Sequence, residues 1–460
     1  MTIHIQRLPY HTDSADLFET IRHLDWPVFL DSGRPMVSQG RYDILSASPY
    51  LTLTTQGDET EIRDRNSAQL SDQDPLDLLR GYLQSVDIQE HPEIPFAGGA
   101  IGYFSYDLAR RWMRLPALDA DKEKLPQMAV ALYDWALVVD HEFKKSWLVS
   151  RGKDPRTLQA WSDLVEGFSN PLRQLTASFK LTSPIKSHLT RKEYAQRFDR
   201  IQHYIREGDC YQVNFAQWFS ATVEGDPWAL YRQLREANPA PFSAFLDYPF
   251  ASILSSSPER FLNLRHGKVE TRPIKGTRPR SEEPEVDKLL RASLVNSEKD
   301  RAENLMIVDL LRNDLGRVCR TGSVKVPALF EVESFAQVHH LVSTISGEMD
   351  TGQDTADLLR ACFPGGSITG APKLRAMEII DELEESRRGL YCGSIAYIGM
   401  DGSMDSNIAI RSLVIAGQDL QFWAGGGIVA DSDEEDEFQE ILDKASAIFT
   451  ALGAEPSLMN

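Results

Sequence analysis

The sequence predicts a mixed α+β fold with a large buried core. The chain has 460 residues, of which 42% are hydrophobic and 25% are charged. This balance is typical of a globular protein that is long enough to bury a sizeable core. Strand-like segments predominate and do not alternate regularly with helices, which argues against a doubly wound parallel sheet. No internal repeat or low-complexity tract interrupts the pattern.

The first predicted region, residues 1–170, consists mainly of short strands and turns. The stretch Ser169–Ser187 that follows is mostly polar, contains two prolines and is typical of a linker. It leads to a second region over residues 190–450. In the first region, strands are expected near 50–55, 98–103 and 130–139, and a helix near 155–167.

The second region begins with a clear helix signal. Thr190 and Glu193 form a capping box, in which each side chain satisfies a backbone N–H of the first turn. Apolar residues then recur at helical spacing, and Gly208 is a plausible end of the helix. Further on, strands are expected at 211–219, 242–246, 251–254 and 268–274, and helices near 286–296, 297–315, 372–385 and 432–452.

The net charge of the chain and the spacing of its cysteines argue against several classes of function. The net charge is −19, from 49 Lys+Arg and 68 Asp+Glu, and such a chain repels nucleic-acid backbones unless it has a basic stripe, which is absent. The same negative field opposes the binding of an anionic metabolite. Such a substrate would therefore have to be held by cationic side chains in the site, by helix N-termini or by a metal ion. The four cysteines have no C-x-x-C spacing, which argues against a zinc site and a disulfide framework.

These features indicate a cytoplasmic protein. No stretch approaches 18 uninterrupted apolar residues, so no membrane span is expected. The first residues lack the basic patch and apolar run of a secretory signal. The scattered cysteines fit a reducing compartment.

Two helices carry acidic pairs that suit a hard cation. Asp300 and Glu303 lie one turn apart on one face of the helix from Ser297. The last helix is expected to begin at Ser432 with Glu435 as its capping partner, and Glu437, Glu440 and Lys444 share one side of it. Carboxylates from separate helices could hold magnesium. Each pair alone is explained more readily by the favourable effect of acids near a helix N-terminus.

A glycine-rich loop, Phe363–Lys373, runs into a helix whose first residue is expected to be Pro372. Free backbone amides at such a terminus bind carboxylate or phosphate. The loop lacks the Lys-Ser/Thr ending of a Walker A motif. A tight turn without any ligand explains the segment equally well.

Lys275 lies in an extended segment between a proline and Gly276, and glycine lets another group approach the backbone closely. A lysine directed into a site can act as a nucleophile. The ordinary alternative is a surface lysine with a buried stem. His340 and Arg411 likewise have structural roles as their default interpretation.

Taken together, these segments are much more specific than any one of them, and the chain resembles the chorismate-utilising enzymes. That family includes anthranilate, isochorismate and salicylate synthases and the enzymes that aminate chorismate at C4. The resemblance covers essentially the whole chain and is strongest over 190–450. The segments that carry it are Ser257–Arg260, Arg272–Thr277, Asp300–Asn304, His340–Ser343, Gly365–Lys373, Ile410–Ser412, Gly425–Ser432 and Glu437–Glu440.

Lys275 discriminates within this family. The anthranilate, isochorismate and salicylate synthases have alanine at this position, whereas the C4-aminating members resemble the Pro-Ile-Lys-Gly-Thr seen here. The segments Cys210–Asn214 and Pro241–Phe245 also resemble those members. The resemblance therefore implies amination of chorismate at C4 to give 4-amino-4-deoxychorismate, a precursor of 4-aminobenzoate and folate.

The resemblance also implies the roles of individual residues. Lys275 would attack C2 of the chorismate ring as the C4 hydroxyl leaves, and ammonia would then resolve this covalent intermediate at C4. Glu259 would protonate the leaving hydroxyl, and His340 would orient that side. Glu303 and Glu440 would hold Mg²⁺, with Asp300 and Glu437 assisting through water. The substrate would be bound by Arg411, Lys444, Gly426, Gly427, Tyr391 and Thr369.

The fold and the partner also follow from the resemblance. Family members stack two large, mostly antiparallel sheets face to face with helices outside, and both regions contribute to this sandwich. No cysteine lies in a Gly-x-Cys-x-Gly nucleophile elbow, so ammonia is expected from a partner glutamine amidotransferase, as a heterodimer, or from solution. The alternatives are an anthranilate synthase large subunit that carries lysine, and a non-catalytic chorismate-binding homologue.

One more expectation concerns an amino-acid pocket. In anthranilate synthases, the N-terminal region and the segment matching Asn238–Phe242 form a tryptophan pocket. The chain keeps Ser32, Pro241 and Phe242 in similar segments. A serine beside an apolar cleft could hold the polar end of tryptophan, without a regulatory role. Packing at a sheet edge is an equal alternative.

Overall fold

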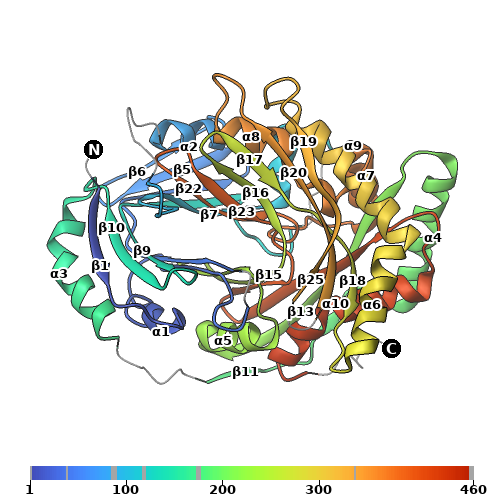
Figure 1. Cartoon of the computed structure of the whole chain (residues 1–460), viewed down its shortest axis with the longest axis horizontal. Helices are drawn as coiled ribbons and strands as arrows, with labels where there is room; N and C mark the ends of the chain where they lie inside the picture. The colour runs from blue at the N-terminus through green and yellow to red at the C-terminus, as the bar shows by residue number, and fades with distance from the viewer. Residues whose placement is uncertain are drawn as a thin grey trace.

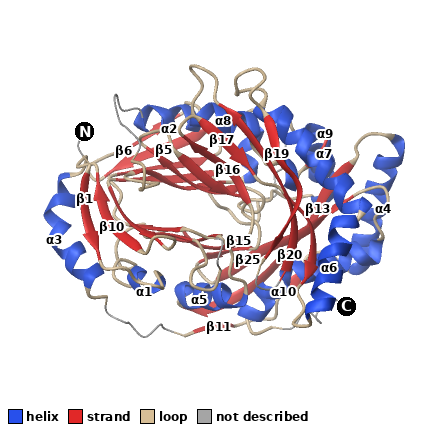
Figure 2. Ribbon diagram, viewed as in Figure 1, coloured by secondary structure: helices blue, strands red, loops and turns tan. Residues whose placement is uncertain are grey.

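The computed structural model describes residues 3–37, 40–83, 91–116, 121–171, 178–335 and 338–454. Two large sheets lie face to face, and helices cover their outer surfaces (Figures 1 and 2). All pairings between the named strands are antiparallel. The predicted sandwich with helices on its outside is confirmed. Within the described residues, no helix is long and apolar enough to span a membrane.

Sheet A has 13 strands among the described residues, and its strands come from both predicted regions. β12 (Lys186–Ser187) and β21 (Gly370–Ala371) pair with β13 outside the main order. The main order is β1 (His4–Leu8), β10 (Lys145–Ser150), β9 (Trp135–Asp140), β3 (Tyr42–Ser46), β2 (Val28–Asp31), β14 (Phe242–Tyr248), β15 (Ala251–Ser257), β24 (Ser412–Ala416), β25 (Asp419–Ile428), β13 (Gln212–Gly225) and β11 (Phe179–Leu181).

Sheet B has 12 strands among the described residues and is likewise built from both regions. β19 (Lys325–Ser334) pairs with β20 outside the main order. That order is β18 (Ile274–Pro279), β20 (Val338–Glu348), β17 (Lys268–Thr271), β16 (Arg260–Arg265), β23 (Met404–Asn407), β22 (Ser394–Gly399), β7 (Gly99–Phe104), β8 (Met128–Tyr133), β4 (Leu51–Gln56), β5 (Glu59–Asp64) and β6 (Ala68–Ser71).

The helices form two outer layers. Sheet A is covered by α1 (Ala15–Phe18), α3 (Pro155–Ser169), α4 (Arg191–Glu207), α5 (Pro227–Ala237), α9 (Lys373–Glu384) and α10 (Glu434–Ala451). Sheet B is covered by α2 (Pro75–Leu83), η1 (Tyr106–Arg111), α6 (Pro284–Asn296), α7 (Glu298–Leu315) and α8 (Thr355–Cys362), with the short η2 (Gly366–Ile368) against α7.

The core follows the two-residue period of the strands. In β9, Leu137 and Val139 pack under the helices that cover sheet A, whereas Ala136 and Val138 face the layer between the sheets. Such alternation gives each sheet two buried faces. The sequences of such strands are accordingly nearly continuous runs of apolar residues.

The run predicted as one strand over 130–139 is two strands in different sheets. Asp134 separates β8 in sheet B from β9 in sheet A. Its buried carboxylate accepts hydrogen bonds from Ser150 Oγ and from the backbone N–H of Lys153. The run 268–274 is also interrupted: β17 ends at Thr271 and β18 begins at Ile274.

Helix starts agree closely with their sequence signals. The capping box of Thr190 and Glu193 forms with both bonds, and Gly208 ends α4 in the left-handed region. The last helix begins later than predicted, because Asp433 and not Ser432 accepts the N–H groups of its first turn. Pro372 is the residue before α9 and not its first residue. Within the predicted linker, β11 and β12 pair with β13, and 172–177 lie outside the described residues.

Candidate active site

Lys275 lies on a bulge of β18. The pairing of β18 with β20 shifts register between Ile274 and Thr277. Gly276 between them has φ +84°, and a Cβ there would come within 2.9 Å of Asp300 Cγ on α7. Only glycine combines this conformation with so close an approach. The bulge therefore redirects the chain at Lys275 and seats the strand against α7.

Three carboxylates face the Lys275 ammonium group. Burial raises the pKa of Glu259 and of Glu303, and the positive charge of Lys275 opposes this rise. The pKa of Glu440 is lowered mainly by Lys444, and Lys275 adds to this effect. These acids come from the β15–β16 connection, α7 and α10 respectively. On the other side, a Cβ placed on Gly427 of β25 would lie 3.5 Å from Lys275 Nζ. Lys275 thus lies where the edge of sheet B meets the end of β25 in sheet A.

Glu259 is a buried carboxyl group with a raised pKa. Its exposed fraction is 5%, and it accepts hydrogen bonds from the Ser367 hydroxyl and the backbone N–H of Ile274. Burial raises the pKa, while Ser367 and Lys275 oppose this rise. A raised pKa keeps more of the group protonated near neutral pH. Glu259 is therefore suited to donate a proton to a bound ligand.

His340 on β20 is held as a neutral imidazole. Burial and the nearby charge of Arg411 lower its pKa to about 3. Its Nδ1 lies 2.9 Å from Thr277 Oγ1, and it makes a further hydrogen bond to the backbone of Gly276. The ring is thus tied to both residues that follow Lys275. It can orient a ligand but is not charged at physiological pH.

Arg411 supplies a cation next to His340. Its backbone has φ +51°, between β23 and β24. The guanidinium Nη1 donates to Asn238 Oδ1 at 3.0 Å, and burial lowers its pKa. No ion pair to Arg411 occurs in the described part of the chain. A partly buried arginine without a carboxylate partner is suited to bind a carboxylate ligand.

The acidic residues of α7 and α10 form a cluster interleaved with lysines. Glu303, Glu437 and Glu440 influence one another, since the two α10 acids raise the pKa of Glu303. Lys299 Nζ lies 3.2 Å from Glu437 Oε1, and Lys444 Nζ lies 2.5 Å from Glu440 Oε1. Burial raises the pKa of Glu437 and of Glu303, whereas Lys444 lowers that of Glu440.

Asp300 is directed elsewhere. Its carboxylate pairs with Arg278 at 2.8 Å, and its backbone N–H donates to Ser297 Oγ, which caps the helix. Across the described ranges, no three His, Cys, Asp or Glu side chains are arranged to hold a metal ion as they stand. One observation nevertheless fits a cation: Glu437 is 3% exposed, and its Oε2 has no hydrogen-bond partner.

Gly426 and Gly427 let these side chains approach the backbone of β25. A Cβ on Gly426 would lie 3.3 Å from Glu437 Oε2, 3.5 Å from Glu440 Oε1 and 3.7 Å from Lys444 Nζ. A Cβ on Gly427 would collide with Gln212 Nε2 at 2.1 Å. Lys444 also donates to the carbonyl of Gly425. Glycine is thus required for the contact between β25 and the charged cluster.

The glycine-rich loop and Tyr391 are anchored to the scaffold. Thr369 Oγ1 donates to the Gly365 carbonyl within the loop. Lys373 at its end pairs with buried Asp314 on α7 at 2.7 Å. Tyr391 is buried and stacks on Trp423, with ring centroids 6.0 Å apart. These contacts fix the loop but join neither Thr369 nor Tyr391 directly to Lys275.

Sequence reasoning assigned no role to three residues of the site. Gln212 is 1% exposed, and both ends of its side-chain amide lack a partner next to Gly427. Its segment contributes to the resemblance, but spacing gives no signal of an unpaired amide. Lys299 directly precedes Asp300 and could have been noticed as a cation at an acidic helix start. Asn238 positions Arg411 from a distant loop.

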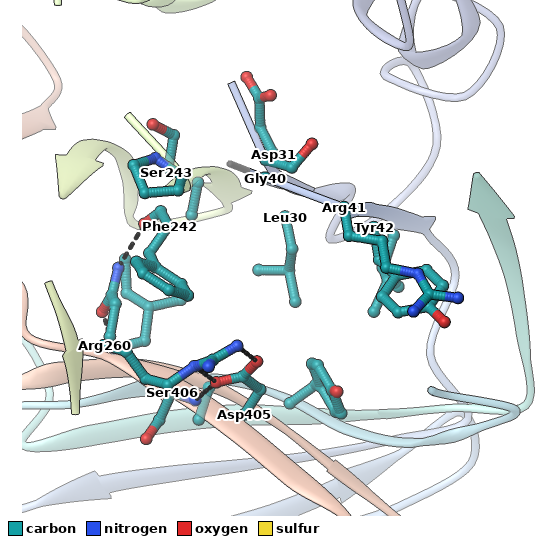
Figure 3. A pocket seen from close by; sticks show the side chains of 18 residues that line it. Leu30, Asp31, Gly40, Arg41, Tyr42, Phe242, Ser243, Arg260, Asp405 and Ser406 are labelled. Atoms are coloured by element: carbon teal, nitrogen blue, oxygen red, sulfur yellow. Dashed lines mark hydrogen bonds and ion pairs between the residues drawn. The ribbon is translucent and has the colours of Figure 1, made fainter. Parts of the chain in front are cut away.

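Ser32, Pro241 and Phe242 lie together in the wall of a separate cavity of about 160 Å³. Figure 3 shows Leu30 and Phe242 in this wall, and Arg260 paired with Asp405 on one side at 3.0 Å. Ser32 is buried and donates through Oγ to Asp43 at 2.6 Å. Its oxygen remains able to accept a hydrogen bond.

The chain matches known proteins over nearly its whole length. Residues 33–450 match the family model described as chorismate binding enzyme. The chain is 51% identical to aminodeoxychorismate synthase component 1 of Klebsiella aerogenes, over 97% of this chain and 98% of that protein. It is 48% identical to the component 1 of Escherichia coli (strain K12), over 97% of each.

A solved structure agrees with the fold. Anthranilate synthase component I from Streptococcus pneumoniae TIGR4 superposes with a TM-score of 0.79, at 33% identity, over 89% of this chain and 92% of that chain. The similarity covers both sheets, since the two sheets include strands from both ends of the chain.

We expect His340 to remain uncharged throughout the range from pH 5 to 8. The Arg411→Met variant should raise the pKa of His340, because it removes a neighbouring positive charge. Chemical shifts of the imidazole carbons, followed by NMR against pH, measure this directly. Arg63→Met, at an exposed strand far from the site, serves as the control. A midpoint for His340 near 6.5 in the unchanged protein would contradict the assignment.

Proposed function

Since the chain belongs to the chorismate-binding enzyme family, we propose that it aminates chorismate at C4 to give 4-amino-4-deoxychorismate. This product is a precursor of 4-aminobenzoate and folate. The observation that carries the proposal is Lys275, which lies between Glu259, Glu303 and Glu440 where other branches of the family have alanine. The identities of 48% and 51% to aminodeoxychorismate synthases support the same conclusion.

Lys275 acts as the nucleophile of the first step. The lone pair of its free amine forms a bond to C2 of the chorismate ring, both ring double bonds shift by one position, and the bond from C4 to its hydroxyl breaks. Glu259 gives its proton to the departing oxygen, which leaves as water. Burial of Glu259 favours this role, because it raises the pKa of the carboxyl group.

Ammonia then forms the bond at C4, the two double bonds shift back, and the bond between C2 and Lys275 Nζ breaks with its electron pair returning to the nitrogen. The new C4 ammonium group gives a proton to the Glu259 carboxylate, so that both the free amine of Lys275 and the acid are regenerated. The unpartnered amide of Gln212, beside Gly427, offers both a donor and an acceptor to polar groups of the ligand. Arg411 binds a carboxylate of the substrate, and neutral His340 orients the hydroxyl side.

The acidic cluster fits a magnesium ion. Glu303 and Glu440 would hold it, with Glu437 further out, and Glu437 Oε2 has no hydrogen-bond partner among the described residues. Asp300 pairs with Arg278 and would assist through water only by giving up that pair. Oxygen ligands of this kind suit Mg²⁺, which needs only one or two carboxylates. When bound, the metal neutralises negative charge on the substrate's ring carboxylate. Lys299 pairs with Glu437 and Lys444 pairs with Glu440, and both lysines offset the repulsion among the acids.

The ammonia comes from a partner glutamine amidotransferase, in a heterodimer, or from solution. The relatives are named as a first component, which supports a second one. The four cysteines are buried, free thiols, so none is placed as an exposed nucleophile for glutamine hydrolysis. The free thiols also support a cytoplasmic location.

Lys275→Ala should lose chorismate amination by about 100-fold or more, because it removes the group that forms the covalent intermediate. Chorismate consumption and product formation are measured with ammonium and magnesium. Intact-mass analysis of the unchanged protein with chorismate should show an adduct at Lys275. Chorismate binding, measured by calorimetry, should change little.

Three outcomes would contradict this function. An alanine variant with full activity removes the covalent mechanism. A product aminated at C2 with loss of pyruvate identifies an anthranilate synthase instead. If chorismate binds but is not consumed by the unchanged protein, the chain is a non-catalytic homologue. Lys180→Ala, which removes an exposed lysine on β11, is the matched control.

Glu303→Gln or Glu440→Gln should raise the magnesium concentration for half activity by at least about tenfold, because each removes a charged oxygen ligand. Calorimetric titration with Mg²⁺ gives a second readout. Glu434→Gln is the control, because that acid begins α10 and pairs with Arg191. Equal shifts of the magnesium requirement in all three variants would mean that these acids attract the cation only through the overall negative field, and that none of them is a specific ligand.

The second proposal is that the cavity at Ser32, Pro241 and Phe242 binds tryptophan without regulating the reaction. Leu30, Phe242 and Pro241 give the cavity apolar walls for an indole. The Ser32 oxygen can accept a hydrogen bond from the ammonium group, while its own proton goes to Asp43.

We expect purified protein to release tryptophan on denaturation, as detected by mass spectrometry, and added tryptophan to leave chorismate amination unchanged. Phe242→Ala should reduce the amount released, because it opens the apolar wall. If nothing is released and added tryptophan gives no thermal stabilisation, the cavity has another role. Strong inhibition by tryptophan would favour an anthranilate-type enzyme.

A further inference from the structure

Lys299 is a lysine of the acidic cluster that takes no part in the proposed reaction. It is the second residue of α7, and its Nζ lies 3.2 Å from Glu437 Oε1 on α10. Its charge also reaches the two expected metal ligands: it opposes the rise that burial causes in the pKa of Glu303, and it adds to the lowering of the pKa of Glu440 by Lys444. Lys299 therefore acts on all three glutamates of the cluster.

The acids of the cluster are balanced by lysines of the chain itself. Three glutamates face three ammonium groups, those of Lys275, Lys299 and Lys444. A magnesium ion brings further positive charge, so it has to compete with these groups for the carboxylates. Lys444 is held by a second hydrogen bond, to the carbonyl oxygen of Gly425 at 3.0 Å, and Lys275 is the proposed nucleophile. Lys299 is therefore the ammonium group best placed to give way.

The two partners of this ion pair differ in their freedom to move. The Glu437 side chain is 4% exposed, and Ser432 Oγ donates to its Oε1 at 2.6 Å. The Lys299 side chain is 38% exposed, and its charge is carried at the end of a flexible stem. When a second cation approaches, the lysine can move into solvent while the carboxylate stays in place.

The second oxygen of Glu437 indicates that Lys299 is not its complete partner. Oε2 is buried and has no hydrogen-bond partner in the part of the chain that the structure describes. It faces β25, because a Cβ on Gly426 would lie 3.3 Å from it and 3.5 Å from Glu440 Oε1. A permanent bridge between α7 and α10 would leave this buried oxygen unsatisfied, which is costly. A magnesium ion held by Glu440 keeps several waters, and one of these can donate to Oε2.

We infer that Lys299 is a positioning residue of the metal site, a counter-ion that competes with magnesium for the negative charge of Glu437. This rests on the magnesium site of the proposed function. When no metal is bound, the lysine offsets the buried charge of Glu437 and stabilises the fold. When magnesium binds, two positive groups share one carboxylate and repel each other. Removing the lysine charge thus lowers stability and raises metal affinity, whereas loss of a merely structural residue would lower both.

The test compares Lys299→Met with the unchanged full-length protein at neutral pH. Calorimetric titration with Mg²⁺ should give a dissociation constant about fivefold lower for the variant, as expected for a partly exposed ion pair. In EDTA, the variant should melt at a lower temperature than the unchanged protein. Lys299→Arg keeps the positive charge and should bind Mg²⁺ as the unchanged protein does. Lys299→Gln is a second neutral variant, which serves if circular dichroism shows that Lys299→Met is misfolded.

Two further substitutions identify the route of the effect. Lys288→Met removes the same charge from α6, where the lysine is exposed and pairs with Glu285, and should leave the Mg²⁺ affinity unchanged. In a Glu437→Gln background, Lys299→Met should no longer strengthen Mg²⁺ binding, because the carboxylate for which the two cations compete is gone.

Three results would overturn this role of Lys299. The neutral variants bind Mg²⁺ no more tightly than the unchanged protein, Lys288→Met has the same effect as Lys299→Met, or the gain in affinity persists in the Glu437→Gln background. If the unchanged protein binds no Mg²⁺, the magnesium site of the proposed function fails together with this role. Chorismate amination itself is judged separately, by the Lys275→Ala experiment.

Discussion

The antiparallel pairing of β13 with β25 is the constraint on which the Lys275 site depends. It runs unbroken from Val213–Ile428 to Thr222–Asp419. At one end, Gly427 lies against Gln212 and Lys275. A slip of one residue would turn every side chain of the pair to the opposite face. The register of this one ladder thus determines which side chains reach the site.

The buried pair of Glu384 and Arg388 fixes one end of this ladder. Glu384 accepts a hydrogen bond from the backbone N–H of Ala216 on β13. Arg388 donates to the carbonyl oxygens of Ile368 and Asn214, which belong to the glycine-rich loop and to β13. Removing either partner would leave a buried charge uncompensated, which is strongly destabilising. The pair therefore fixes the position of the loop relative to the strand.

The sequence predicted the outer architecture better than the contents of the site. Local signals were sufficient for α4, whose capping box and terminal glycine are read directly from Thr190, Glu193 and Gly208. The sequence did not predict that the chain passes from one sheet to the other at Asp134. β8 and β9 are both apolar, and the sheet to which each strand belongs is determined by pairing partners that are distant in the sequence. The unpaired amide of Gln212 and the contact of Lys299 with Glu437 depend on non-local packing, which has no sequence period. The family resemblance supplied the roles that spacing alone left open.

The crossing of the chain at Asp134 has a consequence for how the protein forms during synthesis. β2 pairs with β14, more than two hundred residues later, and β7 pairs with β22 still further along the chain. Pairings over such separations form slowly, because the chain loses entropy in closing the long loop before the strand contacts stabilise it. The strands that are synthesised first therefore keep apolar faces exposed until the ribosome has completed β25, which ends at Ile428. Nascent chains of this topology depend on protection from aggregation during that interval.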